Sequence, residues 1–220
     1  MGIAPDSSGP ARATMVDTQV RTNDVTDLDL IEAMRAVPRE RYCAPARAFA
    51  AYADAEPEIC PGRWLMRPRD VAKLLQAARP VPGEKALAIA GPYAAAVLAH
   101  VGLEVTAQEG DARASAVVGP PLGEAGVVSV TTDLKTPEGS GWDLIVCEGA
   151  VAQAPEAWLM ALRPGGRLAV VLRDGPVGKA RLFVRLEASG GKEGGATSRE
   201  VFDATPPVLQ GFERQAVFQF

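Results

Sequence analysis

The sequence predicts a doubly wound α/β fold with a largely parallel sheet. Short apolar stretches alternate with helical periodicity from residue 63 to about residue 173. One of them, residues 85–90, runs through a tight turn at Gly91 and Pro92 into an alanine-rich helix. Strands that alternate with helices favour parallel pairing through right-handed crossovers. The 220 residues, 47% of them hydrophobic, suffice for one sizeable domain.

The segment before the sheet is expected to divide into a disordered leader, residues 1–14, and a helical cap, residues 15–62. The leader is rich in Pro, Ser, Ala and Gly. In the cap, a capping residue, Asp27 or Thr26, precedes apolar residues that recur at helical spacing from Leu30 to Val37, and Pro38 ends the run. A second, alanine-rich helix is expected over 45–53.

Residues 63–220 are expected to form a Rossmann-like domain with seven strands. The predicted helices cover 68–78, 94–101 and 154–162, and a turn is expected at 163–166. The predicted strands before the tail cover 85–90, 103–109, 126–132, 142–149 and 167–173. In the tail, two further apolar stretches flank a glycine-rich loop, which predicts an antiparallel hairpin at the sheet edge.

Composition excludes several classes of function. The formal net charge is −4 and no run of basic residues occurs, so nucleic acid is not expected as a partner. The three cysteines are widely spaced and lack a companion histidine cluster, which predicts neither a disulfide scaffold nor a metal site. No stretch matches a signal peptide or a membrane helix. A cytoplasmic protein without a membrane partner is therefore expected, and its oligomeric state stays open.

The turn at Gly91 is the first candidate ligand site. In doubly wound sheets, ligands bind beyond the carboxyl ends of the strands where the strand order reverses. Glu109 ends the next strand, at the distance from Ile89 at which an acid binds ribose hydroxyls in dinucleotide sites. The alternative is that Glu109 is a solvated strand end.

Three segments then carry a resemblance to a known family. They read "AMRAVPRERY", "GRWLMRPRDVAKLLQAARPVPGEKALAIAGPYAAAVLA" and "GWDLIVCEGAVAQAPEAWLMALRPGGRLAVV". In this order they resemble the protein-L-isoaspartate O-methyltransferases, from about Met15 to the end of the chain. The resemblance implies a methyltransferase-type sheet, S-adenosyl-L-methionine as cofactor, and methylation of isoaspartyl carboxyl groups in protein repair.

The cofactor loop departs from the family pattern. An acid and three glycines of the family are replaced in a shorter loop, with Ala88 at the acid's position and Ala90, Gly91 and Pro92 in the turn. Glycine permits positive φ and close backbone approach, whereas proline fixes φ and lacks an N–H donor. These changes predict weakened or lost binding of the cofactor.

The predicted substrate segment departs as well. Met66 stands where family members carry a Ser or Thr near the isoaspartyl carboxylate, and a thioether cannot donate a hydrogen bond. Arg67 and Arg69 could bind a carboxylate instead, because a guanidinium matches its geometry. The alternative is that both arginines are solvated residues at a helix start.

Other family positions are retained. The resemblance implies that Glu109 binds ribose, that Asp133 lies near adenine and that Glu148 lies in the loop after the fourth strand. Tyr93 and Gly91 complete the predicted cofactor site. The competing interpretations are a local cap for Asp133, close packing for the segment at Glu148, and a space-filling role for Tyr93.

Two functions follow from these observations. The first is a divergent isoaspartyl methyltransferase with weak, redirected or absent activity on a protein or peptide substrate. The second is a non-catalytic binding or scaffolding protein on the same fold. A nicotinamide dehydrogenase is disfavoured because the first turn lacks GxGxxG. No individual catalytic residue is predicted.

Overall fold

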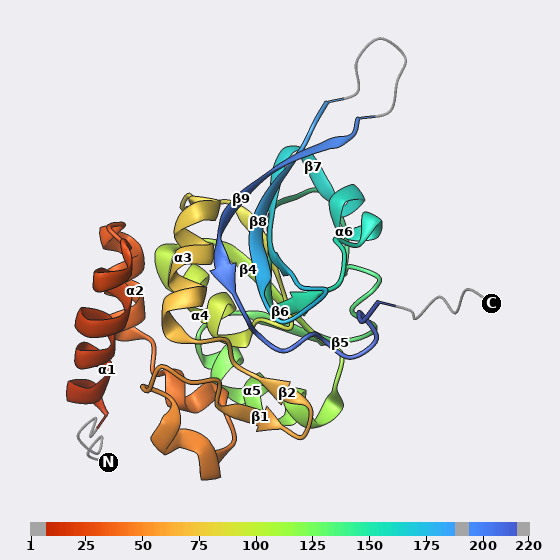
Figure 1. The fold of residues 1–220 in the computed structure, drawn as a ribbon. Coiled ribbons are helices and arrows are strands. Elements are labelled where there is room, and N and C mark those ends of the chain that lie inside the picture. Colours follow the sequence, from red (N-terminus) through yellow and green to blue (C-terminus); the bar gives the residue numbers. More distant parts are fainter. Residues whose placement is uncertain (1–7, 188–193, 215–220) are drawn as a thin grey trace.

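The computed structural model describes residues 8–187 and 194–214, and its centre is a twisted sheet with helices against it (Figure 1). Within those residues the main sheet has seven strands in the order β5-β4-β3-β6-β7-β8-β9. The strands are β3 (Lys85–Ile89), β4 (Glu104–Glu109), β5 (Val128–Thr131), β6 (Trp142–Val151), β7 (Leu162–Leu172), β8 (Gly178–Arg185) and β9 (Ala196–Ala204).

The pairing confirms the predicted doubly wound, mostly parallel sheet. Strands β5, β4, β3, β6 and β7 are parallel to one another. Strands β8 and β9 add antiparallel pairs at one edge, as the two apolar stretches of the tail predict. The chain therefore winds outward from β3 to β5 and then returns to β6 on the other side of β3.

Helices α3 (Pro68–Ala78), α4 (Pro92–Val101) and α5 (Ala112–Glu124) pack on one face of the sheet. Helix α6 (Glu156–Ala161) belongs to the smaller core on the other face, where the buried Trp158 donates a hydrogen bond to the carbonyl of Leu134 at 2.7 Å. The alternation of side chains along each strand divides the sheet between these cores.

The N-terminal part forms a largely helical cap beside α3 and α4 (Figure 1). Asp27 caps α2 by accepting hydrogen bonds from the backbone of Asp29 and Leu30. The elements are α1 (Gly9–Met15), a π-helical turn (Val16–Val20), α2 (Leu28–Ala36), 3₁₀ turns (Arg21–Asn23, Arg39–Tyr42 and Pro45–Ala50), and the hairpin strands β1 (Glu58–Cys60) and β2 (Arg63–Trp64).

The structure corrects the expected N-terminal boundary. Residues 9–14 of the expected leader belong to α1, whereas 1–7 lie outside the described residues. Arg12 of this segment is buried and α1 contacts α2, so packing against the cap orders a segment whose composition resembles a linker. The boundary at residue 62 between the cap and the sheet domain stays a prediction.

Two local expectations also differ from the structure. The alanine-rich segment near residue 50 forms a 3₁₀ turn rather than a longer helix. The expected turn at 163–166 lies within β7. A Cβ at Gly166 would lie 2.6 Å from the carbonyl oxygen of Trp142, so the glycine permits a close backbone approach to the neighbouring strand.

The segment after β9 returns to the carboxyl end of β6. The backbone of Ala150 donates to the carbonyl of Pro207 at 3.0 Å and accepts from Leu209 at 2.8 Å. A Cβ at Gly149 would lie 2.8 Å from the side chain of Leu209. This C-terminal segment, residues 206–212, therefore packs over the end of β6, where doubly wound folds bind ligands. None of the helices described is both long and apolar enough to cross a bilayer.

Candidate functional site

The strand order reverses between β3 and β6. At this switch point the chain leaves β3 through Ala90 and Gly91 and enters α4 at Pro92. Ala90 is fully buried and has a φ of +49°, a conformation that costs a residue with a Cβ about 1–2 kcal/mol. Pro92 begins α4 and supplies no N–H there. The turn thus connects strand to helix as ligand-binding loops of such sheets do, but it has one backbone N–H donor fewer.

The side chain of Glu148 fills the crevice at the switch point, between the carboxyl ends of β3 and β6. A Cβ on Gly91 would lie 3.4 Å from Cγ of Glu148. The carboxylate accepts a hydrogen bond from the backbone N–H of Ala94 in α4, while its Oε2 is buried without a hydrogen-bond partner. Burial raises the pKa of Glu148, although the Arg39 charge opposes the rise.

Arg39 joins the cap to the same region. It is fully buried and donates to the carbonyls of Ala51, at 2.9 Å, and Met66. Its guanidinium lies 4.7 Å from the centre of the Tyr93 ring, a cation–π distance. Burial lowers the pKa of Arg39, despite the opposing effects of Tyr93 and Glu148. We call Glu148, Arg39, Met66 and Tyr93 the closed half of the crevice.

Glu109 lies at the end of β4 and is paired with Arg63. The guanidinium donates two hydrogen bonds to the carboxylate, of 3.0 and 2.7 Å, and one to the carbonyl of Ala90 at 3.0 Å. Both paired side chains are only 8% exposed. Burial disfavours the charge on Arg63, but the contacts with Glu109 outweigh it and raise the pKa of Arg63.

An open pocket of about 350 Å³ adjoins this pair. Its size falls at the lower end of the range for small-molecule sites. Glu109 and Asp133 line it from the ends of β4 and β5, and Leu209 and Phe212 line it from the C-terminal segment. We call this pocket the open half of the crevice.

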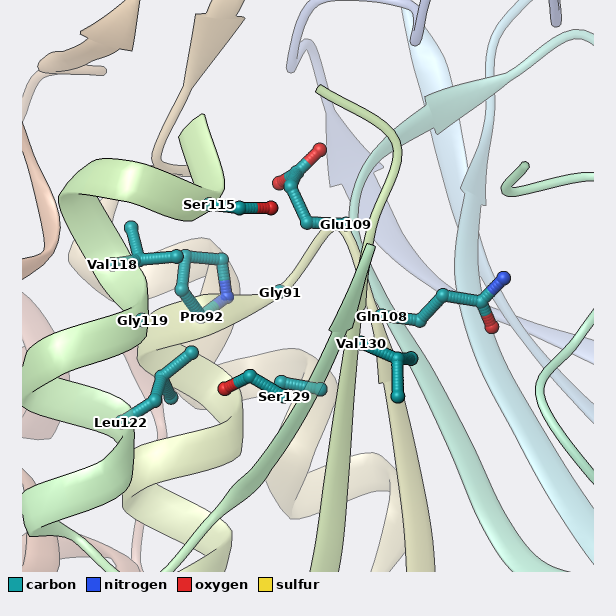
Figure 2. Close-up of a pocket in the computed structure, with 11 residues that line it drawn as sticks. Gly91, Pro92, Gln108, Glu109, Ser115, Val118, Gly119, Leu122, Ser129 and Val130 are labelled. Atoms are coloured by element: carbon teal, nitrogen blue, oxygen red, sulfur yellow. The ribbon is translucent and has the colours of Figure 1, made fainter. Parts of the chain in front are cut away.

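A second, much smaller space lies between the end of β4 and helix α5, and Figure 2 shows the residues that line it. Gln108 and Glu109 point to opposite sides of the sheet, and Glu109 lies on the side of α5, near Ser115 (Figure 2). Gly91 and Pro92 border a cavity of only about 20 Å³ there. That volume is about one water-sized probe, so the space serves packing rather than ligand binding.

No protein-family model matches the chain. Among curated proteins, the protein-L-isoaspartate O-methyltransferase of Methylorubrum extorquens is 35% identical over 207 residues, 85% of this chain and 86% of that protein. The Koribacter versatilis protein of the same name is 31% identical and covers 83% of this chain and 84% of its own length. The chain belongs to the protein-L-isoaspartate O-methyltransferase family.

Solved structures agree with this family's fold. A structure named protein-L-isoaspartate O-methyltransferase superposes with a TM-score of 0.75 over 92% of this chain and 67% of its own, at 19% identity. A Plasmodium falciparum protein, described as a putative enzyme of that kind in complex with S-adenosyl-L-homocysteine, has the same TM-score at 15% identity, over 90% of this chain and 98% of its own. The methyltransferase-type sheet predicted by the resemblance is thereby confirmed.

The isoaspartyl methyltransferase resemblance directs attention to Met66 and Arg67. Met66 is buried and borders, with Trp64 and Glu148, a space of about 10 Å³. Arg67 lies 3.7 Å from a carboxylate oxygen of Glu56, and its side chain is 31% exposed. Arg69 pairs with Asp54 and Asp70. Both arginines thus have carboxylate partners from the chain itself.

The structure brings some predicted cofactor residues together and separates others. Glu109 and Asp133 line the same pocket. Asp133 also accepts a hydrogen bond from the backbone of Lys135 at 3.1 Å, which is the local cap considered as its alternative. Tyr93 is fully buried, 6.2 Å from the ring of Tyr42, in the space-filling arrangement.

Sequence reasoning missed Arg63, Arg39 and the C-terminal segment. Arg63 lies within the quoted segment "GRWLMRP", yet no spacing rule connects it with Glu109, which is far along the chain. Its only local signal is a charged residue among apolar neighbours. Cys147, near the switch point, is free and fully buried, and burial raises its pKa, so it packs as a small apolar residue.

Proposed function

We propose that this protein binds S-adenosyl-L-methionine in the open half of the crevice and methylates isoaspartyl carboxyl groups of proteins or peptides slowly. The main support is the convergence of Glu109 and Asp133 on one open pocket beyond the carboxyl ends of adjacent parallel strands. Such a place is where doubly wound sheets bind ligands. Membership of the isoaspartyl methyltransferase family supplies the reaction.

The residues present fit the adenosine end of the cofactor. The Glu109 carboxylate is suited to accept hydrogen bonds from ribose hydroxyls, and Leu134 and Phe212 offer apolar surface to a base. The amino-acid end fits less well, because Pro92 lacks a donor and the Glu148 side chain fills the crevice. We therefore expect binding that is weaker than an open glycine-rich loop would allow.

S-adenosyl-L-methionine, when bound, supplies a methyl group on a positively charged sulfur. An isoaspartyl carboxyl group is ionised near neutral pH, since its ordinary pKa is about 4, so the protein needs no residue to remove a proton. The chain's task is to orient the acceptor oxygen. Arg67 is the candidate for this task in the segment that the resemblance assigns to the substrate, because exchange of Glu56 for a substrate carboxylate keeps its charge paired.

Calorimetric titration with S-adenosyl-L-homocysteine tests the binding step first. We expect saturable heat with a dissociation constant between micromolar and millimolar. Methyl transfer from labelled S-adenosyl-L-methionine to an isoaspartyl peptide, with the aspartyl peptide of the same sequence as control, then tests the reaction. Equal labelling of the two peptides, or of neither, contradicts the proposed substrate.

A second candidate is a non-catalytic binding protein, and the closed half favours it. Glu148, Met66 and Tyr93 are each at most 1% exposed, so the crevice at the switch point is packed like a core. This candidate predicts no heat with millimolar S-adenosyl-L-homocysteine and no thermal shift. Saturable binding together with isoaspartyl-specific labelling eliminates it.

A further inference from the structure

The side chain of Arg63 lies between the open and the closed half of the crevice. Its side chain lines the open pocket with Glu109 and Asp133, and it also lines the small space with Met66 and Glu148. Leu209 is the other residue common to both linings. Displacement of the Arg63 side chain would therefore join the two spaces into one groove.

The chain holds Arg63 in this position through a short hairpin. Strands β1 and β2 pair in antiparallel fashion, and the turn between them uses Gly62 at a φ of +90°, which glycine adopts readily. Arg63 is the first residue of β2, so its backbone is fixed while its long side chain spans the crevice mouth to Glu109 and Ala90.

The bonds to Arg63 use the acceptor sites of Glu109. Oε1 accepts from Arg63 and from the backbone of Gly110 at 2.8 Å, and Oε2 accepts from Arg63 at 2.7 Å. A ribose diol needs these same carboxylate oxygens as acceptors. An adenosyl ligand and the Arg63 guanidinium therefore compete for one buried carboxylate.

A second carboxylate is available on the other side of Arg63. Glu148 lines the same small space, its Oε2 has no hydrogen-bond partner, and the charges of Arg63 and Glu148 attract each other. A guanidinium that turned from Glu109 toward Glu148 would remain paired, and because the present space holds only about 10 Å³, this turn requires the C-terminal segment at Leu209 to shift. This matters because an unpaired buried charge is strongly unfavourable.

We infer that Arg63 is a specificity-determining gate residue that exchanges Glu109 for Glu148 when an adenosyl ligand enters the crevice. The inference rests on the proposed function, since it assigns the ribose of that ligand to Glu109. Without ligand, the Arg63 guanidinium is hydrogen-bonded to Glu109 and so occupies the position of the ribose. Apparent affinity is then reduced by the fraction of molecules in which Arg63 has left Glu109.

The test is the affinity of purified full-length variants for S-adenosyl-L-homocysteine, measured by calorimetry. Arg63→Met keeps the length of the side chain and removes its charge, and we expect it to bind about tenfold more tightly than the unaltered protein. Adenosine should show the same gain because it carries the ribose alone. Arg167→Met is the matched control: Arg167 forms a bidentate pair with Glu84 outside the crevice linings, and its loss should leave affinity unchanged.

Two further variants keep the test informative if Arg63→Met folds poorly. Arg63→Lys retains the charge but not the bidentate geometry, and an intermediate gain is expected. Glu148→Gln should weaken binding in the unaltered protein, since it removes the second partner of Arg63. It should have no effect in the Arg63→Met background; an equal effect in both backgrounds assigns Glu148 a direct contact instead and overturns the exchange.

The outcomes separate this inference from the proposed function. If the unaltered protein binds S-adenosyl-L-homocysteine and Arg63→Met binds no more tightly, the gate is overturned while the proposed function stands. If only Arg63→Met binds, the gate is supported and the unaltered protein is self-blocked. If neither binds, both are overturned.

Discussion

The two halves of the crevice are built from neighbouring strand ends, yet they differ in packing. The open half leaves about 350 Å³ beside Glu109 and Asp133, whereas the closed half encloses about 10 Å³ around Met66 and Glu148. Both contain a buried carboxylate, but both oxygens of Glu109 accept hydrogen bonds, whereas Oε2 of Glu148 has no hydrogen-bond partner. The comparison teaches that adjacent strand ends of one sheet can differ completely in packing, because one is bordered by an open pocket and the other is filled by buried side chains.

Removing the carboxylate of the open half should have the largest effect. Glu109→Ala leaves the Arg63 guanidinium buried without its partner, which should cost about 3–5 kcal/mol of unfolding free energy. It should also weaken binding of S-adenosyl-L-homocysteine. Urea denaturation and calorimetry measure the two effects.

Glu84→Ala is the control for that change. It breaks the similar Arg167–Glu84 pair outside the crevice linings and should lower stability without altering affinity. An affinity unchanged in Glu109→Ala would remove Glu109 from the ligand site.

Substitution of Gly149 tests how tightly the C-terminal segment, residues 206–212, packs over the closed half. In Gly149→Ala the new methyl group would lie 2.8 Å from the Leu209 side chain, and overpacking of this kind costs about 1–3 kcal/mol. Gly119→Ala is the control, because nothing lies within 4 Å of that position in α5. Equal stability of both variants would show that the C-terminal segment adapts freely.

The buried carboxylate of the closed half predicts a pH dependence. Because burial raises the folded-state pKa of Glu148, its ionisation disfavours the folded state, and stability falls as pH rises from the unfolded pKa of about 4.3 through the folded value. Glu148→Gln removes this loss, so its unfolding free energy should exceed that of the unaltered protein increasingly as pH rises.

Glu84→Gln should behave in the opposite way. The hydrogen bonds from Arg167 lower the pKa of Glu84, so its contribution is present above the unfolded pKa and is lost as pH falls through the folded value. Denaturation curves measured at several pH values below and above the unfolded pKa of about 4.3 would compare the unfolding free energies of the two variants. Parallel pH profiles would contradict the assignment.

The smallest effect is expected at the turn. Ala90→Gly relieves a positive φ at a buried position, but it adds flexibility to the unfolded chain, so a net gain of about 1 kcal/mol or less is expected. Ala88→Gly, in the extended strand β3, should be destabilising. Thermal unfolding of both variants checks this contrast, and a loss in Ala90→Gly as large as in Ala88→Gly would exclude strain at the turn.

Much of the fold could be predicted from local pattern. The helix expected over 68–78 is α3, and the strand expected to begin at Lys85 is β3. Helix α5 was not predicted, because Pro120 and Pro121 interrupt its pattern. Its buried residues Ala114 and Val118 pack in the main core, and this burial stabilises a helix that local propensity disfavours.

The candidate site was predicted only in part. Glu109 was found from its distance to Ile89, and Asp133 and Glu148 from the family resemblance. The partners of these residues could not be found in that way, since Arg63 reaches Glu109 across 46 positions of the chain. Nor does sequence spacing reveal which carboxylates are buried or which of their oxygens lack a partner.

The sequence by itself determined the doubly wound sheet, its antiparallel edge and the turn at the switch point. These features depend on periodicity and on the backbone preferences of Gly and Pro, which act over a few residues. Only the tertiary structure decided that Arg63 occupies Glu109, that Glu148 closes the crevice, and that the C-terminal segment covers it. Burial and charge pairing depend on which distant segments meet, and these contacts exist only after the chain has packed.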